Sequence, residues 1–220
     1  MTAEPDPAIL QNGLEQLREM IAQNRNHPCI FAWGLCNEID GAKPPAKKFA
    51  QALYKEARRL DSHRLLSYAS NTLHIDPRGD VAGEMDILEW NEYFESWYGG
   101  DANTVREALK KIRAIYPNKL IVISEYGLCE CNPKNPTSDE RRVQVLKTHD
   151  AIYREDPLVG GLIFFCYNDY RTHIGDKGQG VMKQRVHGVV DVYGARKPSY
   201  DVLRRESSPV EFLALARDGN

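Results

Sequence analysis

The sequence lacks a strong charge of either sign and has no long hydrophobic run. Its 220 residues carry a formal net charge of −2 with no basic or acidic block, so neither nucleic acid nor a membrane surface is expected as a partner. No apolar stretch approaches the ~20 residues that a transmembrane helix needs. Apolar residues make up 42% of the chain and charged residues 27%, which is the composition of one globular domain with a sizeable core.

Cysteine is also scarce, and its spacing forms no disulfide framework: the five are Cys29, Cys36, Cys129, Cys131 and Cys166. An odd number without regular spacing favours free thiols in a reducing compartment, so a cytoplasmic protein is expected. The pair in Cys129-Glu130-Cys131 has no second pair to complete a metal site, and neither a metal nor another cofactor is expected. The polar, acidic start from Met1 to Pro7 does not resemble a secretory signal, which leaves open a signal on a longer parent chain.

Two further absences narrow the fold. The sequence has no repeat of about 20–50 residues, which excludes a solenoid. It has no glycine-rich turn between a strand and a helix, which gives little support to a doubly wound nucleotide-binding protein.

Apolar periodicity predicts alternating helices and strands. Helices are expected over 8–25, from 44, from 104, after 137 and over 198–205, and strands over 29–35, 65–70, 85–91, 120–125 and 160–167. Thr104 is expected to cap its helix, and Thr137 with Glu140 to form a capping box. Such alternation is typical of parallel strands joined by helices. Five strands cannot close an eight-stranded barrel, so either the sheet is open or the chain is the back part of a barrel.

Two of the apolar strands end in a glutamate. Asn37 and Glu38 follow the first strand directly, and Glu125 ends the fourth. Side chains at the carboxyl ends of parallel strands surround the active site in such folds. Alone, Glu38 is equally well explained as a solvated charge. The second glutamate favours a shared site in which both carboxyl groups converge over one sugar ring.

These motifs resemble the family two glycoside hydrolases, which include β-galactosidases, β-glucuronidases and β-mannosidases. The residues that carry the resemblance are Asn26-His27-Pro28, Trp33, Asn37-Glu38, Asn91-x-Tyr93, Trp97-Tyr98, Ser124-Glu125-Tyr126-Gly127, Gly160-Gly161 and Arg196-Lys197-Pro198-Ser199. The resemblance implies an α/β fold, a partial (β/α)8 TIM barrel in which residues 1–206 hold about strands four to eight with their helices. Residues 207–220 would form a tail.

The resemblance also implies the roles of the central residues. Retaining glycosidases place two carboxyl groups about 5–5.5 Å apart. Glu125 is expected to be the nucleophile and Glu38 the acid and then the base. Asn37 would donate to the sugar 2-hydroxyl, and Tyr93 would hydrogen-bond Glu125, although a core aromatic with its hydroxyl in water is an alternative for Tyr93.

Four more side chains are expected to bind substrate: His74, Trp97, Phe165 and Arg185. Trp97 and Trp90 are candidates for a sugar platform, at even odds with core packing, whereas Trp33 is expected in the core. His74 could face the site, and a solvated histidine is equally plausible. Most charges of the last loop are expected to be solvated.

The substrate expectation depends on that loop. The β-glucuronidases of the family hold the uronic acid carboxylate with an Asn-x-Lys pair, and Met182-Lys183-Gln184-Arg185 does not match it. A retaining exo-β-glycosidase acting on β-galactoside-like or related β-hexosides is therefore favoured, with a β-glucuronidase as an alternative. A second alternative is a catalytically incomplete half barrel that needs a partner or missing N-terminal domains. The exposed edge of the first strand would then suit a homo-oligomer.

Overall fold

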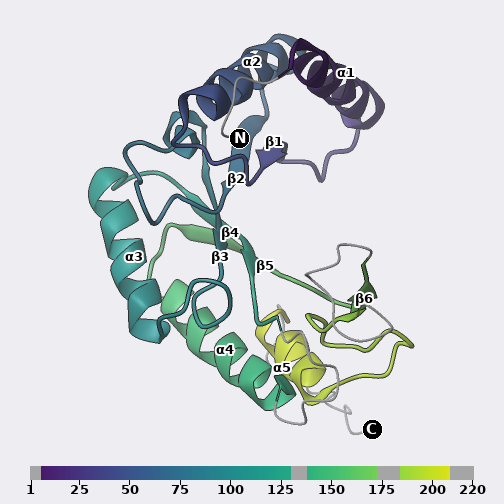
Figure 1. Cartoon of the computed structure of the whole chain (residues 1–220), viewed down its shortest axis with the longest axis vertical. Coiled ribbons are helices and arrows are strands. Elements are labelled where there is room, and N and C mark those ends of the chain that lie inside the picture. The colour runs from purple at the N-terminus through teal and green to yellow at the C-terminus, as the bar shows by residue number, and fades with distance from the viewer. Residues whose placement is uncertain (1–5, 130–137, 173–183, 209–220) are drawn as a thin grey trace, which may run out of the picture.

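A five-stranded parallel sheet forms the centre of the fold. The computed structural model describes residues 6–129, 138–172 and 184–208. The strands are β1 (Ala32–Asn37), β2 (Leu65–Ser70), β3 (Leu88–Glu92), β4 (Ile121–Tyr126) and β5 (Val159–Phe164), and they lie in this order across the sheet. All neighbouring pairs are parallel, so the carboxyl ends of the five strands lie at the same end of the sheet (Figure 1).

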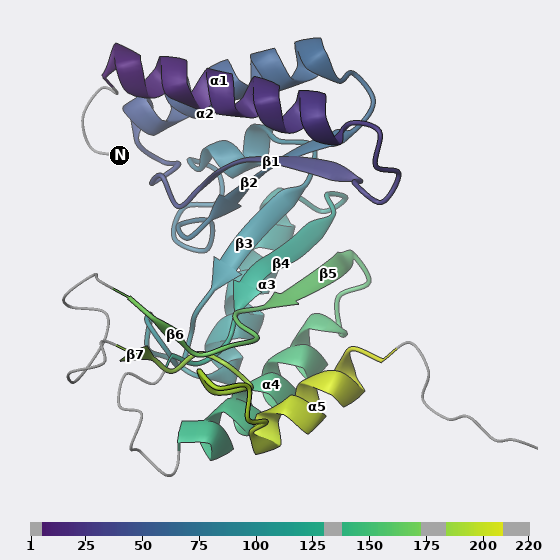
Figure 2. The ribbon, with the colours of Figure 1, turned by 90° about the vertical axis from the view of Figure 1, so that its right-hand side faces the viewer.

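The helices cover the outer side of the curved sheet (Figures 1 and 2). They are α1 (Pro7–Asn24), α2 (Pro44–Leu60), α3 (Ala102–Ile115), α4 (Ser138–Tyr153) and α5 (Pro198–Glu206). Between β2 and β3 stands only a short 3-10 helix, η1 (Val81–Glu84), where the sequence showed no strong helix. Two short strands, β6 (Tyr170–Arg171) and β7 (Gln184–Arg185), pair antiparallel within the last long connection.

The predicted elements are present, with shifts at their ends. The second strand has the predicted bounds, but the first begins at Ala32 because residues 27–30 form a turn in which the Ile30 N–H donates to the His27 carbonyl. The predicted cap of α3 is wrong. Asp101 is the N-cap, and Thr104 forms the reciprocal half of its capping box.

Some expectations fall outside the described residues. These are the ones on Cys131, on Thr137, on Met182-Lys183 and on most of the tail over 207–220. Within the described part of the chain, no helix is long and apolar enough to cross a bilayer.

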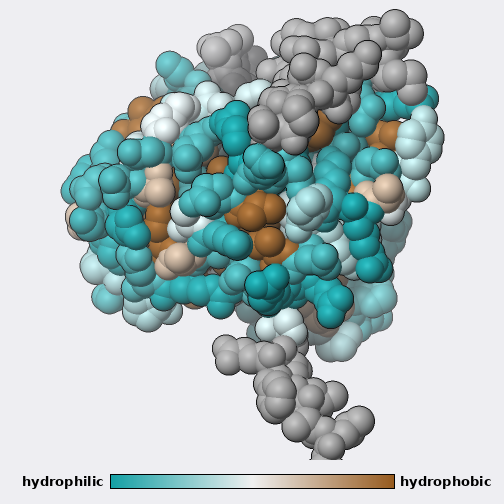
Figure 3. All heavy atoms as spheres, turned by 90° about the horizontal axis from the view of Figure 1, so that it is seen from below, coloured by the Kyte–Doolittle hydropathy of each residue, from teal (hydrophilic) through white to brown (hydrophobic). Residues whose placement is uncertain are grey.

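The core lies between the sheet and the helices. Helix α3 contributes one apolar face, with Val105, Leu109 and Ile112 buried against the strands. Trp33 is in the core as expected, with 3% of its surface exposed. Seen from below (Figure 3), the surface is mainly hydrophilic, with a small apolar patch near its centre. Exposed apolar side chains also occur beside or on the two edge strands, at Phe31 and Ile163.

Asp61 links β1 to the segment that precedes β2, at the amino-terminal end of the sheet. Its carboxylate accepts hydrogen bonds from the Trp33 indole, from the Arg64 guanidinium and from the backbone N–H groups of His63 and Arg64. Arg64 in turn donates to the carbonyl of Ile30. Burial raises the pKa of Asp61, but these hydrogen bonds outweigh burial and hold the pKa below its usual range.

We expect Asp61→Asn to lower the free energy of unfolding by about 1–3 kcal/mol at pH 7, because the variant replaces one carboxylate acceptor oxygen with an NH2 donor and removes the charge from a buried network. Because the folded-state pKa is depressed, the contribution of Asp61 is full above its unfolded pKa of about 3.9 and is lost as the pH falls through the folded pKa. Urea unfolding at pH 7 and pH 3 measures both effects. Glu107→Gln, which removes an exposed pair with Lys110, is the control and should change stability by less than about 1 kcal/mol. Equal effects of the two variants would contradict the prediction.

Candidate active site

Asn37 and Glu38 lie at the carboxyl end of strand β1. The register between β1 and β2 shifts between Gly34 and Asn37, which re-aims the end of the strand. Glu38 has a φ of 51°, in the left-handed region that non-glycine residues avoid at a cost of about 1–2 kcal/mol. Its backbone N–H donates to the Ala69 carbonyl of β2 at 2.9 Å, which holds the residue there. Such local strain is common at active sites.

Asn91 joins the two glutamates. This fully buried residue of β3 is the direct register partner of Glu125 on β4. Its Nδ2 lies 2.9 Å from Glu38 Oε1, 3.1 Å from Glu125 Oε1 and 3.0 Å from Asn37 Oδ1. Ser124 donates its hydroxyl to Asn91 Oδ1 at 2.7 Å, which fixes the orientation of the amide.

The shared nitrogen limits the separation of the two carboxyl groups. Because one oxygen of each lies within 3.1 Å of the same atom, Glu38 Oε1 and Glu125 Oε1 are at most about 6 Å apart. Retaining glycosidases have about 5–5.5 Å between their carboxyl groups, and inverting ones about 6.5–9.5 Å. The two predicted acids therefore converge at one point.

Tyr93 contacts Glu125 directly. Its hydroxyl donates to Glu125 Oε2 at 2.6 Å. Burial raises the pKa of Glu125, and the charge of Glu38 raises it further, while the hydrogen bonds from Tyr93 and Asn91 and the charge of Arg185 act in the opposite direction. Burial has the larger effect, so the pKa of Glu125 is raised overall. Tyr93 therefore aims Glu125 and only partly offsets the cost of its ionisation.

A cavity of about 470 Å³ opens over these residues. Seven of the eight predicted site residues line it: Asn37, Glu38, Tyr93, Trp97, Glu125, Phe165 and Arg185. The Arg185 guanidinium lies over the ring of Trp97, 5.3 Å from its centroid, and 5.7 Å from that of Tyr170. The cavity thus has two carboxylates at one end and a cation among aromatic rings beside them.

His74 is not among the residues that line the cavity. Its ring stacks on Tyr98 at 4.9 Å and lies edge-on to Phe94 at 5.1 Å, and its Nδ1 accepts from the Trp90 indole at 3.4 Å. Burial lowers the pKa of His74, which suits a neutral acceptor. Trp90 is fully buried, so its prediction as a sugar platform is wrong. Trp90 is the middle residue of β3, and its side chain is part of the core.

Sequence reasoning assigned no role to several residues of this site. Asn71, Tyr98 and His187 line the cavity, and Asn91 lies beneath it. Both ring nitrogens of His187 are buried without a hydrogen-bond partner in the structure. Burial, followed by the charge of Arg185, lowers the pKa of His187 to about 3. Asn71 and Asn91 could have been found by the same signal as Glu38, a polar residue at the end of an apolar strand.

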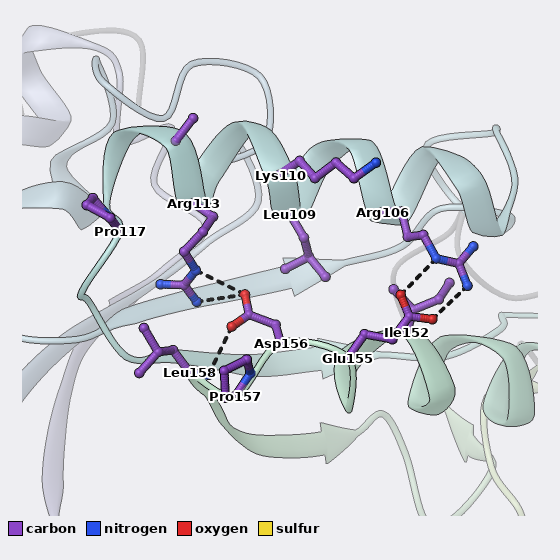
Figure 4. Close-up of a pocket in the computed structure, with 11 residues that line it drawn as sticks. Arg106, Leu109, Lys110, Arg113, Pro117, Ile152, Glu155, Asp156, Pro157 and Leu158 are labelled. Carbon is purple, nitrogen blue, oxygen red and sulfur yellow. Dashed lines mark hydrogen bonds and ion pairs between the residues drawn. The ribbon is translucent and has the colours of Figure 1, made fainter.

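A second cleft, of about 570 Å³, lies between α3 and the segment that joins α4 to β5 (Figure 4). Two ion pairs cross it, Arg106 with Glu155 and Arg113 with Asp156. Since these charges neutralise each other and neither Glu38 nor Glu125 is near, the cleft belongs to helix packing. Among the described residues, no group of three or more His, Cys, Asp or Glu side chains could hold a metal ion.

Two glutamates that converge at the carboxyl ends of parallel strands are the arrangement found in glycoside hydrolases. Comparison with known proteins gives the particular family. The family described as glycosyl hydrolases family 2, TIM barrel domain, matches residues 2–164, and the chain belongs to this family. The predicted fold class, part of a (β/α)8 barrel, is confirmed.

Two curated relatives and one solved structure illustrate the similarity. The β-glucuronidase of Bacteroides fragilis is 33% identical over 117 residues, covering 53% of this chain and 16% of that protein. The β-galactosidase of Thermoanaerobacterium thermosulfurigenes is 26% identical over 205 residues, covering 89% of this chain and 26% of that protein. The β-galacturonidase of Eisenbergiella tayi, bound to galacturonate, has a TM-score of 0.78 and 23% identity, covering 91% of this chain and 37% of that one. The chain thus spans well under half the length of these relatives.

We expect Tyr93→Phe to raise the pKa of Glu125 further, because the variant loses a hydrogen bond that favours the charged carboxylate. Carbon-13 NMR titration of labelled glutamate side chains measures this shift. Tyr98→Phe is the matched control, since the Tyr98 hydroxyl lies at the same cavity but donates to the Asn91 carbonyl. A titration of Glu125 that is unchanged in Tyr93→Phe would show that the hydrogen bond is unimportant.

Proposed function

We propose that this chain carries the active site of a retaining exo-β-glycosidase that works by double displacement. The observation that supports it best is the shared Asn91 amide, which keeps oxygens of Glu38 and Glu125 within about 6 Å of each other. Membership of glycosyl hydrolases family 2 supports the same reaction class.

In the proposed reaction, Glu125 attacks the anomeric carbon while Glu38 protonates the departing glycosidic oxygen, which breaks the glycosidic bond and leaves a glycosyl ester on Glu125. Glu38, now ionised, removes a proton from water, and the water oxygen attacks the anomeric carbon from the face that the leaving group vacated, opposite Glu125, which departs as a carboxylate. The two inversions give net retention. Asn37 Oδ1 accepts from Asn91, and this orients the Asn37 NH2 group as a donor to the sugar 2-hydroxyl.

Neutral β-hexosides, of the β-galactoside type, remain the first proposed substrate class, because Met182-Lys183-Gln184-Arg185 of the last loop does not match the Asn-x-Lys pair. A specific observation supports β-glucuronides as the second. Arg185 lines the same cavity as the two glutamates, and a guanidinium can bind a carboxylate through two parallel hydrogen bonds. The curated β-glucuronidase relative and the galacturonate-bound neighbour support this alternative.

We also propose that additional strands complete the cavity. Both β1 and β5 are edge strands of the described sheet, and Glu38 directly follows one of them. A second copy of this chain or missing N-terminal domains could supply the strands, and the exposed Phe31 and Ile163 favour burial of both edges. Without such a partner the site could be catalytically incomplete. A reducing, cytoplasmic location is likewise a proposal, supported by the free thiols of Cys29, Cys36 and Cys166.

We expect the purified chain to hydrolyse a 4-nitrophenyl β-hexoside with release of the β-anomer, observed by proton NMR. Glu38→Gln should lower kcat about 10²–10⁴-fold, and Glu125→Gln should abolish turnover, because each removes a reacting group. Glu107→Gln, on the exposed side of α3, is the control. An α-anomer as first product, or full activity in Glu125→Gln, would rule out the proposed mechanism. Specific activity that rises with protein concentration would support completion of the site by a second copy.

The two substrate classes are separated by Arg185→Gln. If Arg185 binds a uronate, the ratio of kcat/KM for the β-glucuronide to that for the β-galactoside should fall about 10–100-fold, because a charge-assisted hydrogen bond contributes about 1.5–3 kcal/mol. Arg171→Gln is the matched control, since Arg171 is exposed on β6, next to the β7 strand that carries Arg185. An unchanged ratio would favour the neutral substrate.

A further inference from the structure

His149 on α4 lies between two glutamates of the segment that follows β3. Its Nδ1 is 2.9 Å from Glu92 Oε2, and its Nε2 is 2.9 Å from Glu95 Oε2. The histidine is 1% exposed and Glu92 is fully buried. None of these three side chains lines the cavity, and no step of the proposed reaction uses them.

The hydrogen bonds indicate the charge on this histidine. Glu92 also accepts from the Phe94 backbone N–H on Oε1 and from the Tyr153 hydroxyl on Oε2, so donors surround both of its oxygens. An ionised carboxylate has no hydrogen to donate. With a carboxylate oxygen as the acceptor at each ring nitrogen, both nitrogens of His149 act as N–H donors, which is the imidazolium form.

The two glutamates flank the residue that contacts the proposed nucleophile. Tyr93 follows Glu92 directly, and its hydroxyl donates to Glu125. Glu95 has a φ of 62°, a conformation that needs support in a non-glycine residue. Arg141, also on α4, donates to the Glu95 carbonyl at 3.3 Å. Helix α4 thus holds the chain on both sides of Tyr93.

We propose that His149 is a positioning residue: clamped as an imidazolium between Glu92 and Glu95, it fixes residues 92–98 and with them the approach of Tyr93 to Glu125. The structural part of this proposal stands without a substrate. Its consequence for catalysis rests on the proposed function.

The pH dependence follows from the groups that face the ring. These are Glu92 and Glu95 from the segment after β3, and Asp150 and Tyr153 from α4 itself. Burial lowers the pKa of His149, but the two glutamates outweigh burial and raise it overall. Because the folded-state pKa is raised, the stabilisation is full below the unfolded pKa of about 6.5 and is lost as the pH rises through the folded pKa.

Nitrogen-15 NMR of the histidine side chains tests the clamp in the unmodified chain. We expect His149 to keep N–H protons on both ring nitrogens above pH 6.5. A neutral His149 ring with a single N–H at pH 6.5 would overturn the proposal. This measurement needs no variant, so it remains decisive if a substitution prevents folding.

The variant His149→Gln, which keeps an N–H donor but carries no charge, tests the effect on residues 92–98. Amide exchange at Phe94 and Tyr98 should become at least about 10-fold faster. The pKa of Glu125 should rise, as in Tyr93→Phe. Tyr153→Phe is the matched control, because it removes another donor to Glu92 from α4 and keeps the imidazolium. Unchanged exchange and an unchanged Glu125 titration in His149→Gln would overturn the proposal.

The kinetic consequence is a fall of about 10–100-fold in kcat with little change in KM for His149→Gln, as expected when a reacting group is misplaced. A rise in KM with kcat unchanged would count against a positioning role for His149. If the unmodified chain hydrolyses no β-hexoside at any protein concentration, the proposed activity fails for this chain alone, and the exchange and titration results still decide whether the clamp exists.

Discussion

The NH2 group of Asn91 brings two acidic side chains to one point, and the rest of the site depends on this contact. Carboxylates at close range repel each other strongly in a partly buried cavity. The amide lies between them because β3 lies between β1 and β4, the strands that carry the two acids. Its orientation is fixed from behind by Ser124, so the arrangement is built before any ligand enters. This is preorganisation in the sense used for catalytic sites.

Strain and unfavourable burial are concentrated around this contact. Glu38 and Glu95 both have left-handed backbones, and Glu125 is held where its charge is disfavoured. The compensating interactions lie elsewhere in the fold. Asp61 accepts four hydrogen bonds at the amino-terminal end of the sheet. After β5 in the chain, Lys197 forms an ion pair with the buried Asp169 at 2.7 Å. A well-fastened scaffold can support such costs at a few functional positions.

The two sides of the site are supported by different parts of the fold. Tyr93 belongs to a segment that α4 contacts through His149 and Arg141, so it is anchored on the inside of the fold. Glu38 follows β1, an edge strand of the described sheet, and its backbone N–H donates to the Ala69 carbonyl of β2. A strand paired with the outer edge of β1 would therefore act on the proposed acid/base more than on the nucleophile. Pairing at the outer edge of β1 would therefore bear on the proposed catalysis as well as on the fold.

The sequence by itself determined the alternating strands and helices and the two glutamates, because an apolar strand that ends in a polar residue is a local pattern. Motifs placed Tyr93 beside Glu125. Local pattern could not tell that Trp90 faces the core and that His74 lies behind Tyr98. Asn91 meets its glutamates 53 and 34 residues away in the chain, and His149 meets Glu92 57 residues away. Only the register of the sheet and the docking of α4 bring such distant residues together, so the tertiary structure alone decided those contacts.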